Sequence, residues 1–158
     1  MPCRRVRGLT LIEVVVAIAI AAIMLGLAAP SFVESIARTR LEGAVSTLGI
    51  DVQYARSEAI RRRTNATLTI LSGGASYTIG YTPTSGADVV LKTVALPSGV
   101  SLSAAGPIVF EGLRGTTAAE TITGSSSQTG AQLRVTTNAF GRISTCSPGS
   151  SLHGYTAC

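Results

Sequence analysis

The sequence has few of the side chains on which enzyme active sites depend. It contains one histidine, His153, no tryptophan and only seven aromatic residues among 158. No cysteine or serine stands at a spacing from His153 that is typical of a nucleophile and its base. The seven acidic residues that follow residue 29 are scattered and form no carboxylate cluster. These absences argue against an enzyme and predict neither a catalytic residue nor a cofactor.

Charge is sparse as well, and much of it lies at the N-terminus. The chain has 13 basic and 8 acidic residues, for a formal net charge of +5. Three arginines, Arg4, Arg5 and Arg7, lie within the first eight residues, and without them ten basic residues face eight acidic ones. The net charge of the rest is therefore about +2, so the positive total says little about its surface.

The most prominent feature of the sequence is an apolar run over residues 9–29, in which only Thr10 and Glu13 are markedly polar. A helix of about 20 apolar residues is long enough to cross a bilayer. Because basic residues stay on the cytoplasmic side, the rest of the chain is expected outside the cytoplasm. A carboxylate inside the membrane raises the free energy of insertion by about 2.5–3.5 kcal/mol. A segment that served only as an anchor would therefore not be expected to contain Glu13.

The start of this run, Gly8 followed by LTLIE, resembles the prepilin signature of type IV pilins and type II secretion pseudopilins. The resemblance implies that a prepilin peptidase cuts after Gly8 and methylates the new N-terminus, Leu9. It also implies that Glu13 neutralises the amino group of Leu9 on a neighbouring subunit during assembly. A carboxylate that is protonated and idle in the membrane is the alternative. Pro30 falls where pilins carry a helix-kinking proline.

This resemblance divides the chain into a leader peptide (1–8), a transmembrane and filament-core helix (9–29) and a periplasmic globular domain (30–158). The subunit is expected in the inner membrane as a single-pass protein, and then in a filament. Its implied partners are the prepilin peptidase, the inner-membrane assembly platform and other pilins.

After Pro30, where a kink is expected, a helical pattern resumes. Its apolar residues step by 4, 3, 4, 3 and 4 and form one stripe that is expected to pack on a sheet: Leu41, Val45, Leu48, Val52, Ala55 and Ala59. The helix is predicted to end at residues 61–65, with the arginines at 61–63 in its last turn, where their charge is favourable to the helix dipole.

Beyond residue 65 the period changes to that of strands. Strands are predicted over residues 66–71, 76–81, 89–96, 100–103, 107–111, 131–136 and 142–145. Residues 116–130 are predicted as a loop, with 120–123 as an alternative short edge strand. The predicted fold class is therefore α+β and type IV pilin-like. Its long N-terminal helix has a transmembrane first half and packs on an antiparallel β-sheet domain.

Three further segments resemble the GspH/FimT group of pilins and pseudopilins. They are residues 36–41 (IARTRL), 54–62 (YARSEAIRR) and 140–146 (FGRISTC). The resemblance implies a minor pilin of a type IV pilus, because the late Gly-Arg strand and the cysteines look more like that branch. The alternative is a minor pseudopilin, of the H type, in a type II protein secretion system.

Cys146 and Cys158 are left as an even pair once Cys3 is assigned to the leader. In an oxidising compartment such a pair predicts a disulfide, which closes a 13-residue loop. The bridge would add about 3 kcal/mol on the chain-entropy model. A metal site that also uses His153 is the rival interpretation, but the spacing matches no common zinc pattern.

Residues 141–144 (GRIS) resemble the Gly-Arg-x-Arg motif of pilins that act as DNA receptors, although the second arginine is missing. Arg142, with Arg134 on the partner strand and Arg114 nearby, is expected to contact duplex DNA through phosphates. Ordinary solvated charge is the alternative, because residues 64–158 hold only four basic against three acidic side chains.

The N-terminus of the mature protein separates three interpretations of the apolar run. Mass spectrometry of the purified protein is expected to find a methylated Leu9. A mature chain that begins at Ala29 would instead identify a cleaved secretory signal peptide, whose basic start and apolar core are similar. An intact Met1 would identify a plain membrane anchor.

Overall fold

The computed structural model describes residues 10–150 and 152–158. Helix α1 spans Leu11–Arg62, and a 3-10 turn, η1, spans Pro148–Ser150. The strands are β1 (Ala66–Ile70), β2 (Ser76–Tyr81), β3 (Val89–Ala95), β4 (Val100–Ala104), β5 (Ile108–Phe110), β6 (Glu120–Ser126), β7 (Gln132–Thr137) and β8 (Ile143–Cys146). The chain divides into two units, one that ends at Ser35 and one that begins at Ile36.

The first unit is the N-terminal part of α1. Apart from Glu13, its side chains from Leu11 to Leu25 are apolar on every side of the helix and are exposed, with 83% of Leu11 and 72% of Leu25 accessible. A helix that is apolar all round requires a membrane or other helices around it. By length and composition, α1 can cross a membrane. It continues past Pro30, so the proline does not end the helix, and the kink stays a prediction.

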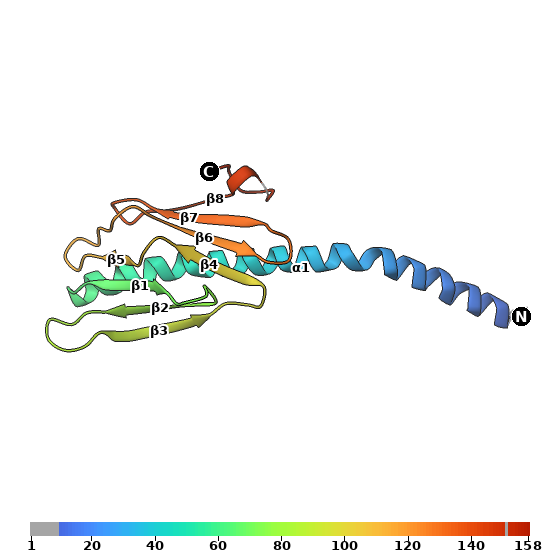
Figure 1. The fold of residues 1–158 in the computed structure, drawn as a ribbon, viewed down its shortest axis with the longest axis horizontal. Coiled ribbons are helices and arrows are strands. Elements are labelled where there is room, and N and C mark those ends of the chain that lie inside the picture. Colours follow the sequence, from blue (N-terminus) through green and yellow to red (C-terminus); the bar gives the residue numbers. More distant parts are fainter. Residues whose placement is uncertain (1–9, 151) are drawn as a thin grey trace, which may run out of the picture. The chain divides into compact units, whose positions relative to one another are not determined.

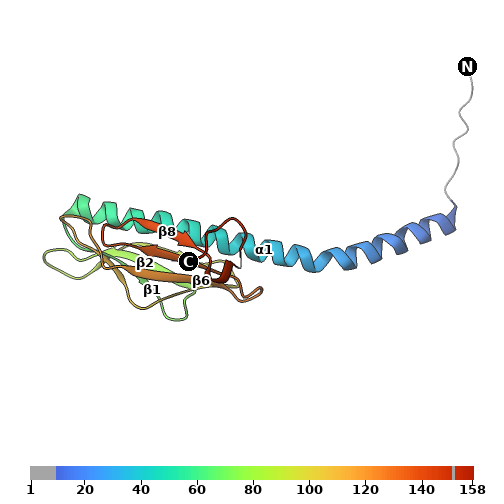
Figure 2. The same ribbon diagram turned by 90° about the horizontal axis from the view of Figure 1, so that it is seen from above.

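The second unit contains the second half of α1 and two antiparallel sheets (Figure 1). The first sheet has the order β3-β2-β1-β5, and the second has the order β4-β6-β7-β8. Figure 2 shows that the strands lie on one side of the helix. Apart from β6, each strand lies within one residue of its predicted bounds. The predicted α+β architecture is therefore confirmed.

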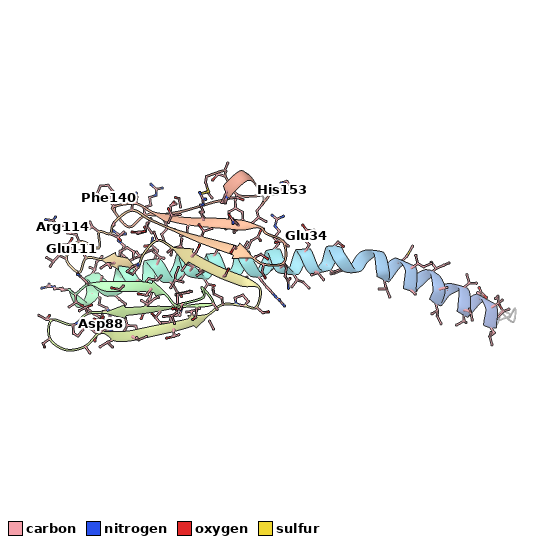
Figure 3. The ribbon with its side chains drawn as sticks, in the orientation of Figure 1. Glu34, Asp88, Glu111, Arg114, Phe140 and His153 are labelled. Carbon is pink, nitrogen blue, oxygen red and sulfur yellow. A yellow bond between two sulfur atoms is a disulfide. The ribbon has the colours of Figure 1, made fainter. Side chains whose placement is uncertain are left out.

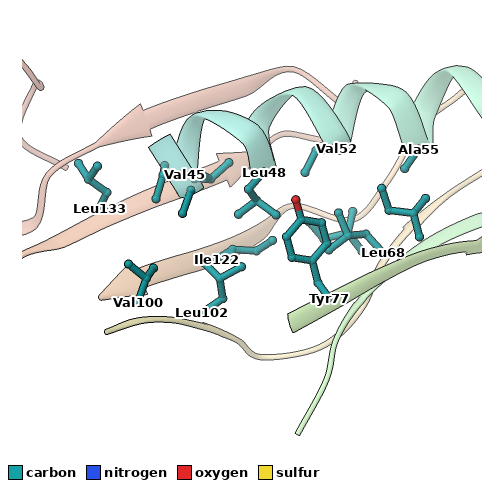
Figure 4. Packing of buried hydrophobic residues seen from close by; sticks show 14 of the residues in the cluster. Val45, Leu48, Val52, Ala55, Leu68, Tyr77, Val100, Leu102, Ile122 and Leu133 are labelled. Carbon is teal, nitrogen blue, oxygen red and sulfur yellow. The ribbon is translucent and has the colours of Figure 1, made fainter. Parts of the chain in front are cut away.

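The predicted apolar stripe of α1 forms the seam of the core. Leu41, Leu48 and Val52 are fully buried, and both sheets contribute side chains against them (Figure 4). The sheet residues include Leu68, Tyr77, Leu102, Ile122 and Leu133. Every residue of this core lies between positions 41 and 152, so the second unit carries its own complete core.

The loop predicted for residues 116–130 is wrong, whereas the alternative strand at 120–123 is present but longer than predicted. Residues 116–130 contain β6, which lies between β4 and β7 inside the second sheet and is not an edge strand. Its buried positions are Ile122, Gly124 and Ser126, so only one of them is strongly apolar and the alternation is hidden. The small residue is needed, because a Cβ at Gly124 would lie 2.9 Å from Cγ2 of Val45. Close packing of α1 on β6 therefore removed the signal that predicts a strand.

A buried polar cluster fixes the helix against the first sheet. Asp51 of α1 is only 3% exposed. Its carboxylate accepts a hydrogen bond of 2.7 Å from the Tyr77 hydroxyl and bonds of 2.6 and 2.9 Å from Nζ of Lys92. Burial, and then the bond to Asp51, raise the pKa of Tyr77. Because buried polar groups are costly without partners, the cluster allows one position of the helix on β2 and β3.

Removal of the acceptor tests this role. Asp51→Ala is expected to lower the free energy of unfolding by about 2–3 kcal/mol, because it leaves the Tyr77 hydroxyl and the Lys92 ammonium unpaired. The measurement is urea denaturation of residues 31–158. Glu42→Ala is the matched control, because Glu42 pairs with Arg38 in a partly exposed position and should cost no more than about 1 kcal/mol. Equal losses in the two variants would contradict a special role for Asp51.

Candidate functional site

The N-terminal candidate region is described only in part. Gly8 and Leu9, the expected processing residues, lie outside the described residues, and so does the side chain of Pro30. Glu13 lies in the first turn of α1 and is exposed. Its backbone N–H donates to Oγ1 of Thr10 at 3.4 Å, and its carboxylate accepts the Thr10 N–H at 3.5 Å. This reciprocal arrangement is a capping box, although both bonds are long.

The capping box gives Glu13 a local role that the sequence analysis missed. The signal was present, because Thr10-Leu11-Ile12-Glu13 fits the pattern of a threonine followed three residues later by glutamate. The carboxylate also stands at the positive end of the helix dipole, where an anion is favoured. Glu13 therefore stabilises the start of the helix in the isolated chain, and it remains exposed to a neighbour.

The C-terminal tail is closed by a disulfide between Cys146 and Cys158, with the Cα atoms 5.0 Å apart. Leu152 is buried against the core, and the guanidinium of Arg38 donates a 2.6 Å hydrogen bond to the backbone carbonyl of His153. The His153 side chain is exposed. Within residues 10–150 and 152–158, no group of three His, Cys, Asp or Glu side chains could hold a metal ion. The tail is therefore a packed and cross-linked segment.

The structure separates two of the predicted DNA-contacting arginines. Arg134 lies opposite Cys146 on β7 and β8, whereas Arg142 lies just before β8, opposite Asn138. The alternation of the strands places both on the same face of the hairpin. Four residues of strand nevertheless separate their positions by about 13 Å. Arg134 is partly buried, and its Nε is enclosed without a hydrogen-bond partner among the described residues.

Arg114 and Arg142, by contrast, come from neighbouring loops. The backbone N–H of Thr117 donates to the Ala139 carbonyl at 3.2 Å, which joins the loop after β5 to the turn after β7. Two side chains of α1 hold this pair of loops. Nε of Arg56 donates to the Gly115 carbonyl at 3.1 Å, and Nε2 of Gln53 donates to the Gly141 carbonyl at 3.3 Å.

Gly141 is required for this arrangement. Its φ of +71° is favourable only for glycine, and a Cβ would lie 2.9 Å from Cδ of Arg56 and 3.1 Å from the Gly115 carbonyl oxygen. The glycine thus allows the turn, the neighbouring loop and the helix to meet. Sequence analysis missed the roles of Gln53 and Arg56, because contacts over 59 and 88 residues leave no local pattern.

The end of α1 lies at the same place. The backbone N–H of Gly112 donates to Oδ1 of Asn65 at 3.3 Å, so the loop after β5 also contacts the end of the helix. Glu58 accepts 2.7 Å hydrogen bonds from both Arg61 and Arg62. These bonds, first from Arg61 and then from Arg62, lower the pKa of Glu58. Arg62 also lies over the ring of Tyr81, 4.3 Å from its centroid.

We call this region the basic end of the domain. It consists of the end of α1, the loop after β5 and the turn after β7, and Figure 3 labels Glu111, Arg114 and Phe140 there. Together with Glu120, which pairs with Thr137 beside the turn, its charged residues are six arginines and three glutamates: Arg56, Arg61, Arg62, Arg63, Arg114, Arg142, Glu58, Glu111 and Glu120. The resulting net charge of +3 exceeds the value of about +2 for the chain after residue 8. Folding therefore concentrates positive charge that the sequence distributes over 87 residues.

The chain matches two known sequence families. Residues 44–141 match the family of type II transport protein GspH, and residues 3–29 match the prokaryotic N-terminal methylation motif. No curated protein matches the chain significantly.

Solved structures that are similar to this chain include a type IV minor pilin and a minor pseudopilin. The type IV minor pilin FimU of Pseudomonas aeruginosa superimposes with a TM-score of 0.59 at 21% identity, over 75% of this chain and 96% of that one. The minor pseudopilin EpsH from the type 2 secretion system of Vibrio cholerae gives a TM-score of 0.60 at 14% identity, over 70% of this chain and 99% of that one. At these identities the similarity shows the pilin-like fold alone.

Proposed function

This chain belongs to the GspH family of type II transport proteins, and we propose that it is a minor pilin that is assembled into a type IV pilus. The match to this family over the domain, together with a methylation motif at the N-terminus, supports a filament subunit of either machine. The alternative is a minor pseudopilin of the H type in a type II secretion system. The two similar structures, one from each machine, fit almost equally well.

Processing follows from the N-terminal motif. The prepilin peptidase cuts after Gly8 and methylates Leu9, which removes a leader that contains three arginines. Before assembly, α1 spans the inner membrane with its first residues at the cytoplasmic side and the domain in the periplasm, as the basic leader favours. The inner-membrane assembly platform then moves the subunit into the filament.

Glu13 selects the register of one subunit on the next. Its carboxylate is exposed at the start of α1, and the methylated amino group of Leu9 on a neighbouring subunit carries the opposite charge. Two opposite charges in an apolar filament core each reduce the burial cost of the other, whereas an unpaired charge there is costly. The capping box with Thr10 holds Glu13 near the end of the helix that such a neighbour approaches.

Two properties support the pilus over the secretion system. They are the Gly141-Arg142 pair just before β8 and the disulfide between Cys146 and Cys158, which look like the pilus branch of the GspH/FimT group. The disulfide, together with the Arg38 contact to the His153 carbonyl, keeps the tail against the domain. Phe140 and Arg142, on either side of the buried Gly141, are exposed.

Complementation of a gene deletion tests the filament role and the machine together. The deletion is expected to abolish twitching motility and to leave protein secretion unchanged. The wild-type gene should restore motility. Glu13→Ala should remain in the membrane fraction but should not enter filaments, whereas Glu34→Ala, an exposed glutamate beyond the apolar span, should behave as wild type. A deletion that blocks secretion but spares twitching would establish the alternative.

Binding of duplex DNA is a second role, and the basic end supports it. Arg63, Arg114 and Arg142 are exposed there, and the described residues offer them no carboxylate partner. The adjacent Glu58 forms salt bridges with Arg61 and Arg62. Because phosphate contacts release counterions, cations gathered on one surface bind DNA without regard to sequence. Such binding is weak and contributes to DNA uptake by the pilus.

A titration of residues 31–158 against duplex DNA tests this role. Binding is expected at about 50 mM salt and should fade towards about 200 mM. Arg142→Ala should weaken binding and make it less dependent on salt. Arg40→Ala is the matched control, because Arg40 is an exposed arginine of α1 outside the basic end, whereas Arg134, on the same face of the hairpin as Arg142, stays a proposed contact. Absence of binding at low salt, or equal effects of both substitutions, would contradict the role of the basic end.

A further inference from the structure

Two large apolar side chains are exposed at the basic end. Leu113 is 76% accessible and Phe140 is 75% accessible, and these are the highest values for large apolar residues in the described part of the second unit. Single exposed apolar residues are common on protein surfaces. These two are notable because they project from the two adjacent loops that also carry Arg114 and Arg142.

The turn that carries Phe140 is held in one conformation. Oδ1 of Asn138 accepts the backbone N–H groups of Phe140 at 3.1 Å and Arg142 at 2.9 Å. The Asn138 carbonyl accepts the N–H of Gly141 at 2.8 Å. Below the turn, Gln53 binds the Gly141 carbonyl. The backbone that carries Phe140 is therefore already ordered, which lowers the entropic cost of binding a ligand there.

Two exposed arginines without a carboxylate partner among the described residues, Arg114 and Arg142, lie near Phe140, and the acidic residues near them are Glu111 and Glu120. Arg142 follows it by two residues, and the loop that carries Arg114 is bonded to the same turn through Thr117 and Ala139. The nearby carboxylate of Glu111 accepts a 2.8 Å hydrogen bond from the Thr116 hydroxyl. An exposed aromatic ring between cations fits a polyanion that also offers flat apolar surfaces. Nucleic acid strands have this combination when their bases are unpaired.

We propose that the basic end binds single-stranded DNA in preference to duplex, with an unpaired base stacked on Phe140 and the flanking phosphates on Arg114 and Arg142. This inference rests on the proposed DNA-binding role. In a duplex the faces of the bases are covered by their neighbours, so the ring reaches a base only if the stack opens. A single strand offers the face of every base, and stacking on an aromatic side chain tolerates any sequence.

The test compares two probes with the full-length protein in nonionic detergent at low salt. The probes are a 20-nucleotide oligothymidine strand and a 20-base-pair duplex. We expect the single strand to bind more tightly than the duplex. Phe140→Leu should weaken binding of the single strand by about 5- to 100-fold and leave duplex binding unchanged. Phe140→Tyr, which keeps an aromatic ring, should retain the preference. Leu113→Ser is the matched control for loss of an exposed apolar side chain.

The outcomes separate this inference from the proposed role. Duplex binding that depends on Arg142, without a preference for the single strand, would overturn the inference and leave the duplex role intact. Equal weakening of both probes by Phe140→Leu would also overturn it, because it would indicate a wedge inserted between paired bases. Binding of neither probe would contradict both proposals. It would instead favour an acidic protein as the partner of this surface.

Discussion

The contact between the second half of α1 and two sheets is the constraint on which the rest of the domain depends. A single stripe of the helix has to cover β-strands from both sheets, so small residues are placed where the backbones approach. Gly124 in β6 faces Val45, and Ala55 and Ala59 are fully buried on the helix. Larger residues at these positions would separate the helix from the sheets, because a packed core tolerates little additional volume.

This contact also explains the polar groups inside the domain. Apolar packing alone would allow the helix to slide by a turn on the sheets, since the stripe repeats along its length. Asp51 removes that freedom, because its two partners, Tyr77 on β2 and Lys92 on β3, are available at one position of the helix only. Within the next five residues of the same helix, Gln53 and Arg56 donate hydrogen bonds to the turn after β7 and the loop after β5. The position of α1 therefore determines where the basic end forms.

Sequence alone predicted the parts that depend on local pattern. The apolar stripe of α1 and seven of the eight strands among the described residues follow from periodicity and turn residues. The cysteine pair followed from an even number of cysteines beyond the leader. The family resemblance rested on short segments at the N-terminus, at the end of the helix and near the C-terminus, and the family match over residues 44–141 agrees with it.

Other features were decided only by the tertiary structure. β6 was predicted only as a short alternative strand, because its buried positions include Gly124 and Ser126, which are small to admit the helix and so conceal the alternation. The separation of Arg134 from Arg142 follows from the register of β7 with β8. The gathering of Arg63, Arg114 and Arg142 depends on hydrogen bonds between segments far apart in the chain. The spacing of apolar residues shows which face of each helix or strand can be buried. Charged residues on loops and helix ends have no such spacing. Which of them lie close together is therefore determined only by the tertiary structure.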